Sequence, residues 1–163
     1  MTIWSGGKRD PKPFIPEREA LSLRLMIDSF ELHAQLAADC IEVGRLHLSK
    51  VLLTNDSTYP WLILVPERPG LTEFYELDPM DRYRLSDEIV IASDVLRNLY
   101  SPDKMNVAAL GNQVPQLHVH VIARKKTDPA WPGPIWGKVP VAPYKAKDLE
   151  RRLADLRSAF AGP

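Results

Sequence analysis

Residues 111–124 read GNQVPQLHVHVIAR, and polar and apolar side chains alternate from residue 116 onward. In a β-strand, successive side chains point to opposite faces of the sheet. A strand over residues 117–123 therefore presents Gln116, His118 and His120 on one face and apolar residues on the other. We predict that the apolar face packs on a core and that the polar face forms a functional site.

The two histidines of this strand are spaced so that they can flank a small anion. Residues two apart on a strand lie about 6.5 Å from each other, which leaves room for a phosphate between two imidazoles. Gly111 frees the backbone of the preceding loop, and Asn112 and Gln113 add amide donors beside the same face. A solvent-facing polar row is the simplest alternative.

A zinc site is the other alternative, because two histidines at this spacing can bind a metal ion. A complete zinc site needs a third and a fourth ligand. Only His33, His47 or distant acidic residues could supply them. The single cysteine, Cys40, excludes an internal disulfide and any multi-cysteine zinc site, and is expected to be a small buried side chain.

The composition describes one globular domain. The chain has 163 residues, of which 45% are hydrophobic and 26% charged, enough to bury a sizeable core. Twenty-one basic residues balance 21 acidic ones, so no strong overall field would attract nucleic acid. We expect no nucleic-acid partner.

No apolar run in the sequence is long enough for a membrane span. The longest, residues 61–65, falls far short of the roughly 20 residues that a spanning helix needs. Charges and prolines occupy the N-terminus where a secretion signal would be apolar. We expect no membrane partner and a cytoplasmic location.

The most regular helical pattern covers residues 79–100. Asp78 is a good N-cap and Pro79 suits the first helical position. Apolar residues then recur at alternating intervals of four and three residues, which makes one apolar stripe. Residues 146–160 show a similar pattern and predict a C-terminal helix, and a short helix is predicted over residues 31–41.

Strand patterns lie between these helices. Residues 45–54 and 61–65 are rich in leucine and valine, and Pro60 and Pro66 bound the second run. Residues 105–110 and 117–123 are joined by a link of hairpin length. This mixture predicts an α+β fold with an antiparallel sheet of about five strands, two main helices and a C-terminal helix.

The segment GlnLeuHisValHisVal at residues 116–121 resembles the histidine triad (HIT) motif, in which three histidines alternate with hydrophobic residues. Asn55, the 61–69 segment, the long helix, Asn106 and the 111–115 loop also fall in the order typical of the family. The resemblance implies a HIT-like fold. Family members form homodimers, and an exposed edge at residues 105–110 also favours a homodimer here.

The resemblance further implies one HIT-like domain over residues 1–163. Its core covers about 30–126, preceded by an irregular N-terminal arm at 1–20. A segment rich in proline and tryptophan, 127–144, leads to the C-terminal helix at 145–160. Trp131 and Trp136 in this segment are expected to pack, and a lid over a nucleotide base is the alternative.

The resemblance implies chemistry on a nucleotide. The middle histidine of the motif, here His118, is the nucleophile on the α-phosphorus and forms a covalent nucleotidyl-histidine; the last is His120. A substrate such as a dinucleoside polyphosphate or a nucleoside phosphoramidate is implied, with no metal and no cofactor. Asn112 and Gln113 would contact the phosphate or leaving group. Asn55 would lie near the ribose, and Asn106 completes the substrate-binding set.

Two positions depart from the family pattern. Gln116 occupies the place of the first histidine, and an amide cannot shuttle a proton, although it is counted here with the catalytic positions. Trp61 replaces a histidine common at the start of its strand and is expected to fill core, with an altered nucleotide pocket as the alternative. The alternative function is therefore a nucleotide-binding module with impaired turnover, and a metal-binding regulator is a more distant possibility. The basic run 124–126 is expected to be a solvated edge.

Overall fold

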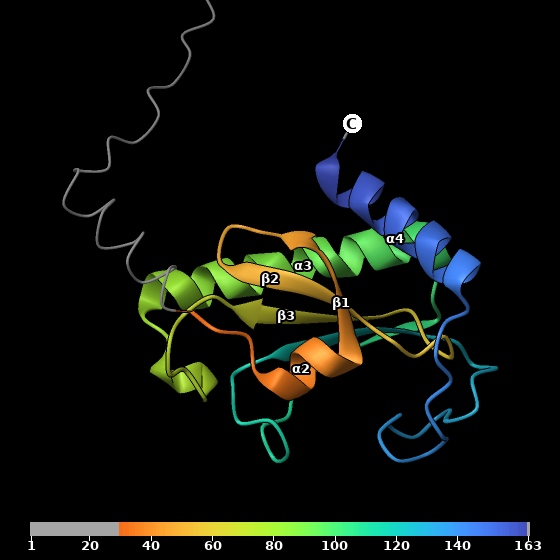
Figure 1. Cartoon of the computed structure of the whole chain (residues 1–163), viewed down its shortest axis with the longest axis horizontal. Coiled ribbons are helices and arrows are strands. Elements are labelled where there is room, and N and C mark those ends of the chain that lie inside the picture. Colours follow the sequence, from red (N-terminus) through yellow and green to blue (C-terminus); the bar gives the residue numbers. More distant parts are fainter. Residues whose placement is uncertain (1–29, 163) are drawn as a thin grey trace, which may run out of the picture.

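The computed structural model describes residues 30–162 and contains a five-stranded antiparallel sheet (Figure 1). The strands lie in the order β1-β2-β3-β5-β4. Their bounds are Cys40–Arg45 for β1, Ser49–Thr54 for β2, Trp61–Pro66 for β3, Lys104–Ala109 for β4 and Val119–Arg124 for β5. The α+β class is confirmed. The predicted N-terminal arm, residues 1–20, lies outside the described residues.

Three α-helices accompany the sheet within residues 30–162. They are α2 at Ala34–Asp39, α3 at Pro79–Tyr100 and α4 at Ala146–Ala161, with a 3₁₀ turn at Phe74–Glu76. The long helix begins as predicted: the Asp78 carboxylate accepts a hydrogen bond from the backbone N–H of Asp81 at 2.8 Å. None of the helices in residues 30–162 is long and apolar enough to cross a membrane.

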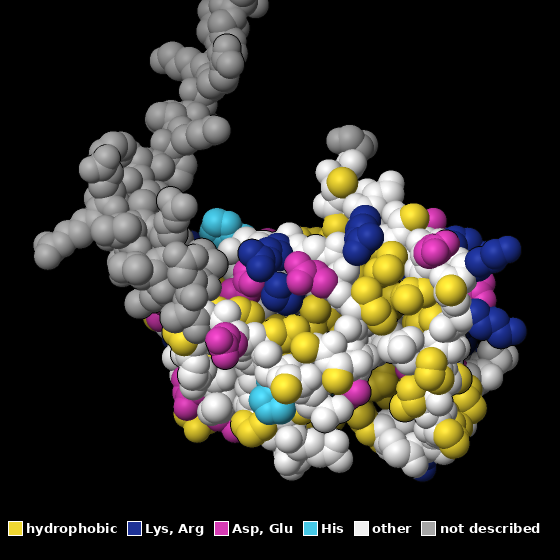
Figure 2. All heavy atoms as spheres, in the orientation of Figure 1, with side chains coloured by type: hydrophobic (Ala, Val, Ile, Leu, Met, Phe, Trp, Pro, Cys, Tyr) yellow, Lys and Arg dark blue, Asp and Glu magenta, His cyan; other side chains and the backbone are white. Residues whose placement is uncertain are grey.

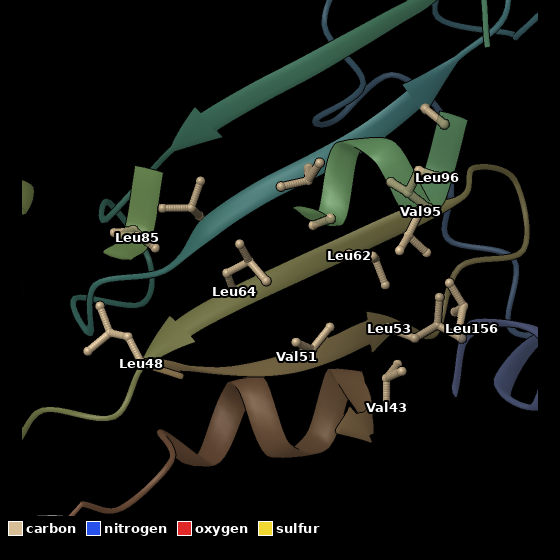
Figure 3. Close-up of a cluster of buried hydrophobic side chains, with 14 of the residues drawn as sticks. Val43, Leu48, Val51, Leu53, Leu62, Leu64, Leu85, Val95, Leu96 and Leu156 are labelled. Atoms are coloured by element: carbon tan, nitrogen blue, oxygen red, sulfur yellow. The ribbon is translucent and has the colours of Figure 1, made fainter. Parts of the chain in front are cut away.

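α3 and α4 cover one face of the sheet, whereas α2 and the 127–144 segment lie on the other (Figure 1). The main core forms between the sheet and the two long helices, where leucines of β3 meet those of α3 and α4 (Figure 3). Leu62, Leu64, Leu85, Leu96 and Leu156 are fully buried there. Each such side chain contributes about 2 kcal/mol to folding by leaving water.

The N-terminal part of the fold differs from the prediction. The helix predicted over 31–41 ends at Asp39, and Cys40 begins β1 instead. The strand predicted over 45–54 is a hairpin turn followed by β2. Pairing of Cys40 with Thr54 extends the ladder to β2. The apolar spacing of residues 31–41 also suits a helix, but the long-range pairing with β2 makes the chain a strand from Cys40 onward.

The 127–144 segment contains no helix or strand and is tied to the sheet through Arg124. This side chain is only 2% exposed. Its guanidinium donates two hydrogen bonds to the Asp128 carboxylate, at 2.7 and 2.9 Å, and one to the carbonyl of Gly133 at 3.0 Å. The prediction of a solvated basic edge is wrong for Arg124 and right for Lys125 and Lys126, which are exposed.

Candidate functional site

A cavity of about 630 Å³ opens on the face of the sheet opposite α3 and α4. Figure 2 shows it as a hollow between α2 and the 127–144 segment, rimmed by hydrophobic side chains. Its floor comes from β3 and β5, and its walls from α2, the 111–115 loop and the 127–144 segment. Both motif histidines, His118 and His120, line it.

His118 is held by the backbone next to it. Its Nδ1 lies 2.7 Å from the carbonyl oxygen of Gln116, and the residue is 5% exposed. A carbonyl oxygen only accepts hydrogen bonds, so Nδ1 carries the ring proton. The lone pair of the neutral imidazole therefore resides on Nε2. This is the state in which a histidine attacks an electrophile.

His120 is held by a side chain. Its ring lies 4.9 Å from that of His118, centroid to centroid. The indole Nε1 of Trp61 donates a hydrogen bond to Nδ1 of His120 at 3.0 Å. Burial, together with the neighbouring His118, lowers the pKa of His120 to about 3. The side chain is therefore neutral at physiological pH.

Two tryptophans surround His120. The ring centroids of Trp61 and Trp136 each lie 5.4 Å from that of His120, and the two indoles meet edge to face at 6.2 Å. Trp61 contacts both small hydrophobic clusters on this face and also lines the cavity. Trp61 therefore both packs against the core, as expected, and shapes the pocket, which was the alternative.

Gln116 is not part of the cavity wall. Its side-chain oxygen accepts a hydrogen bond from the backbone N–H of His33, and its NH₂ group donates to the carbonyl of Glu31, both at 2.9 Å. β5 begins only at Val119, so the strand alternation does not extend back to residue 116. The amide instead fastens the segment before α2 to the loop that carries His118.

The predicted substrate-binding residues separate into two groups. Asn55, Asn112 and Gln113 line the cavity with the two histidines. The side-chain oxygen of Asn55 accepts a hydrogen bond from the backbone N–H of Tyr144 at 3.1 Å. Asn106 is not among the lining residues, because its side-chain oxygen accepts a hydrogen bond from Arg124 at 2.7 Å.

The sequence reasoning missed two acidic residues that line the cavity, Asp39 and Asp56. Asp56 is 5% exposed, and its carboxylate accepts a hydrogen bond from the backbone N–H of Thr58 at 2.9 Å. The Asn-Asp-Ser sequence signalled a turn and nothing more. Burial raises the pKa of the Cys40 thiol to about 12, so this cavity-lining cysteine stays protonated and is no nucleophile.

The zinc alternative has no geometric support in the described part of the chain. Within residues 30–162, no group of three or more histidine, cysteine, aspartate or glutamate side chains is placed to hold a metal ion. His33 is exposed and caps α2, with Nδ1 accepting a hydrogen bond from the backbone N–H of Gln35. His47 is exposed in the turn before β2.

The HIT domain family model matches residues 35–127, which include the sheet, α3 and both cavity histidines. The chain belongs to the HIT domain family. Membership places it in a superfamily of nucleotide-binding hydrolases and transferases. A search of curated protein sequences gave no match.

Solved structures of HIT proteins from three bacteria resemble this chain closely. A histidine triad protein from Marinobacter aquaeolei VT8 is 48% identical, with a TM-score of 0.79, over 81% of this chain and 96% of that one. One from Bradyrhizobium japonicum is 45% identical, with a TM-score of 0.77, over 78% and 96%. One from Sinorhizobium meliloti 1021 is 41% identical, with a TM-score of 0.78, over 80% and 96%.

Proposed function

We propose that this HIT protein is a nucleotide hydrolase or nucleotidyl transferase that uses His118 as its nucleophile. One observation carries the proposal: the carbonyl of Gln116 holds the proton on Nδ1 of His118, which leaves the Nε2 lone pair in a residue that lines the cavity. The family's chemistry supplies the electrophile, the α-phosphorus of a nucleotide.

The reaction has two displacements. The Nε2 lone pair of His118 forms a bond to the α-phosphorus, and the bond from phosphorus to the leaving group breaks with its electron pair going to the leaving group. The imidazole is then cationic, and the Gln116 carbonyl stabilises its Nδ1–H. Water attacks the same phosphorus, the phosphorus–nitrogen bond breaks back onto Nε2, and the water proton passes to solvent. A nucleoside monophosphate is released.

Transfer differs from hydrolysis only in the second step. If an alcohol or a phosphate oxygen enters in place of water, the nucleotidyl group is transferred to that acceptor. The amide groups of Asn112 and Gln113 would donate hydrogen bonds to the phosphate or the leaving group. Asn55 would offer its NH₂ group to the sugar, because the fold already uses its oxygen. Asn106 would act on the fold through Arg124 rather than on substrate.

The proposed site favours a leaving group that departs as a stable anion. Gln116 cannot deliver a proton, and the lowered pKa of His120 keeps it from storing one at neutral pH. A dinucleoside polyphosphate releases such an anion, whereas a nucleoside phosphoramidate must release a basic amine. We therefore place dinucleoside polyphosphates ahead of phosphoramidates.

The experiment is an assay of mononucleotide release from a panel of both substrate classes. Turnover that falls as the pKa of the leaving group rises supports the proposal. Saturable binding of AMP or GMP without turnover of any substrate would instead favour a nucleotide-binding module. One observation favours this second candidate. The Gln116 side chain is bonded to the backbone of His33 and Glu31, so it supplies no proton donor to the cavity.

A homodimer joined along β4 is the proposed assembly of a single-domain, cytoplasmic protein. Among the described residues, β4 is an edge strand, with unpaired backbone groups on one side. Exposed apolar side chains lie on β4 and on α3 nearby, among them Val107 at 46% and Ile91 at 37% exposure. Sedimentation at micromolar concentration should give twice the 18.4 kDa mass of the chain, and a species of that single mass would contradict the dimer.

A further inference from the structure

The two cavity histidines carry their protons on opposite ring nitrogens. In His118 a carbonyl acceptor requires the proton on Nδ1. In His120 the Nδ1 atom accepts a hydrogen bond from Trp61, whose indole nitrogen is only a donor. Nδ1 of His120 therefore has no proton, and a neutral ring must carry it on Nε2.

We propose that Trp61 is a positioning residue that locks His120 as the neutral Nε2–H tautomer, so that His120 acts as a fixed hydrogen-bond donor and not as a proton shuttle. Its catalytic meaning rests on the function proposed above. Loss of the Nε2 proton would leave an imidazolate, which is strongly unfavourable, and gain of a proton at Nδ1 would break the bond from Trp61. The ring keeps one proton in one place throughout the reaction.

Trp136 provides an internal comparison. It approaches His120 as closely as Trp61 does, with the same 5.4 Å between ring centroids, but its ring nitrogen makes no hydrogen bond within the described residues. Both indoles pack against the ring of His120. Only Trp61 donates to it, so a substitution at each position separates aromatic packing from tautomer control.

The charged and titratable surroundings of His120 do not provide another way to fix its proton. His118 precedes β5 by one residue, and the cavity is also lined by Asp39 and Cys40 from the α2–β1 junction and by Asp56 from the loop before β3. None of these groups forms a hydrogen bond to His120 in residues 30–162. β3 and the 127–144 segment contribute Trp61 and Trp136, which are uncharged.

The test is ¹⁵N NMR of the imidazole nitrogens in the full-length protein, compared between wild type, Trp61→Phe and Trp136→Phe. Spectra of His120→Gln identify the His120 signals. Wild type should show a protonated Nε2 and an unprotonated Nδ1 with no titration between pH 5 and 8. Trp136→Phe should keep that tautomer. Trp61→Phe should give mixed tautomers and a titration midpoint at least one pH unit higher than wild type.

A wild-type signal with the proton on Nδ1 of His120 overturns the inference, and this readout does not depend on whether Trp61→Phe folds. An unchanged tautomer in folded Trp61→Phe also overturns it. Since the NMR readout needs no turnover, it is separate from the proposed function: an Nε2–H signal in a protein without activity supports the inference while the function fails.

Kinetics give a second readout in an active protein. In wild type, His120 should add no pH dependence to kcat near pH 6.5, the range in which a free histidine titrates. Trp61→Phe should add a pH-dependent limb to kcat, because its His120 can now take a proton. Trp136→Phe should not add that limb, even if packing changes raise KM. The limb appearing equally in both variants would contradict a special role for Trp61.

Discussion

The two faces of the sheet are built from alternate residues of the same strands, yet they differ in kind. The face under α3 and α4 joins one continuous cluster in which leucines and valines predominate. The other face has two smaller clusters, with His118, His120 and Arg124 buried beside them. Apolar packing needs only matching volume, whereas each buried polar group needs a particular partner.

This difference separates stability from chemistry along a single strand. In β5, Val119 and Val121 support the helices, and His120 between them faces the cavity. A substitution on the helix-covered face should therefore change only the free energy of unfolding, whereas one on the cavity face can change catalysis as well.

The largest expected effect is on the cavity face. His118→Asn should lower turnover by at least about three powers of ten, because no other side chain in the proposed site replaces the covalent step. Stability should change little. Steady-state kinetics and urea unfolding measure the two quantities, and His47→Asn, on the exposed turn, is the matched control. Turnover within tenfold of wild type would remove His118 from the mechanism.

The next largest effect is a loss of unfolding free energy caused by a substitution on the cavity face. Arg124→Met should cost about 3–5 kcal/mol of unfolding free energy, because it leaves the buried Asp128 carboxylate without its cation. The guanidinium hydrogen bonds hold the pKa of Asp128 below its usual range, as expected for a carboxylate paired with a cation. Lys126→Met, on the exposed neighbour, is the control. A loss below 1 kcal/mol for Arg124→Met would show that the fold does not need the ion pair between Arg124 and Asp128.

Adjacent residues of β3 sharpen the comparison. Leu64→Ala should cost about 3 kcal/mol of unfolding free energy and leave KM of the folded enzyme unchanged, since Leu64 is fully buried under the helices. Ile63→Ala, one residue away, should cost a similar free energy and also change KM, because Ile63 lines the cavity. Equal effects of the two substitutions on KM would erase the distinction between the faces.

The smallest predicted effect is a pH dependence of stability from His120. Its pKa is about 3 in the fold and 6.5 when unperturbed, so the unfolded state binds the extra proton between these values. The contribution of His120 to the free energy of unfolding is fully present above pH 6.5 and is lost as the pH drops toward 3. By pH 5 about 2 kcal/mol of this contribution should be lost.

Unfolding in urea at pH 7 and pH 5 measures this term. Wild type should lose about 2 kcal/mol more than His120→Gln over that interval. The same loss in both proteins would mean that His120 is charged in the fold at pH 5.

The features that could be predicted from the sequence are those set by local patterns. α3 has its cap, its proline and an uninterrupted stripe, and both of its ends match the prediction. β3 is bounded by prolines, and the β4–β5 hairpin is set by its link. Strand alternation predicts that His120 faces the cavity, whereas His118 lines it from the residue just before β5.

The features that could not be predicted depend on contacts between distant residues. Gln116 bonds to backbone more than 80 residues earlier in the chain, which no alternation pattern signals. Trp61 meets His120 only because β3 pairs with β5. Arg124 sits in a run of three basic residues, and its burial depends on Asp128 and on how the following segment folds back.

The central claim is that His118 becomes covalently nucleotidylated. Wild type is mixed with a dinucleoside polyphosphate, quenched within one turnover, digested and analysed by mass spectrometry. We predict a peptide heavier by one nucleoside monophosphoryl group, attached at His118, that disappears on further incubation and is absent from His118→Asn. Rapid turnover with no such adduct, and with inversion of configuration at the phosphorus as expected for a single displacement, would contradict the account.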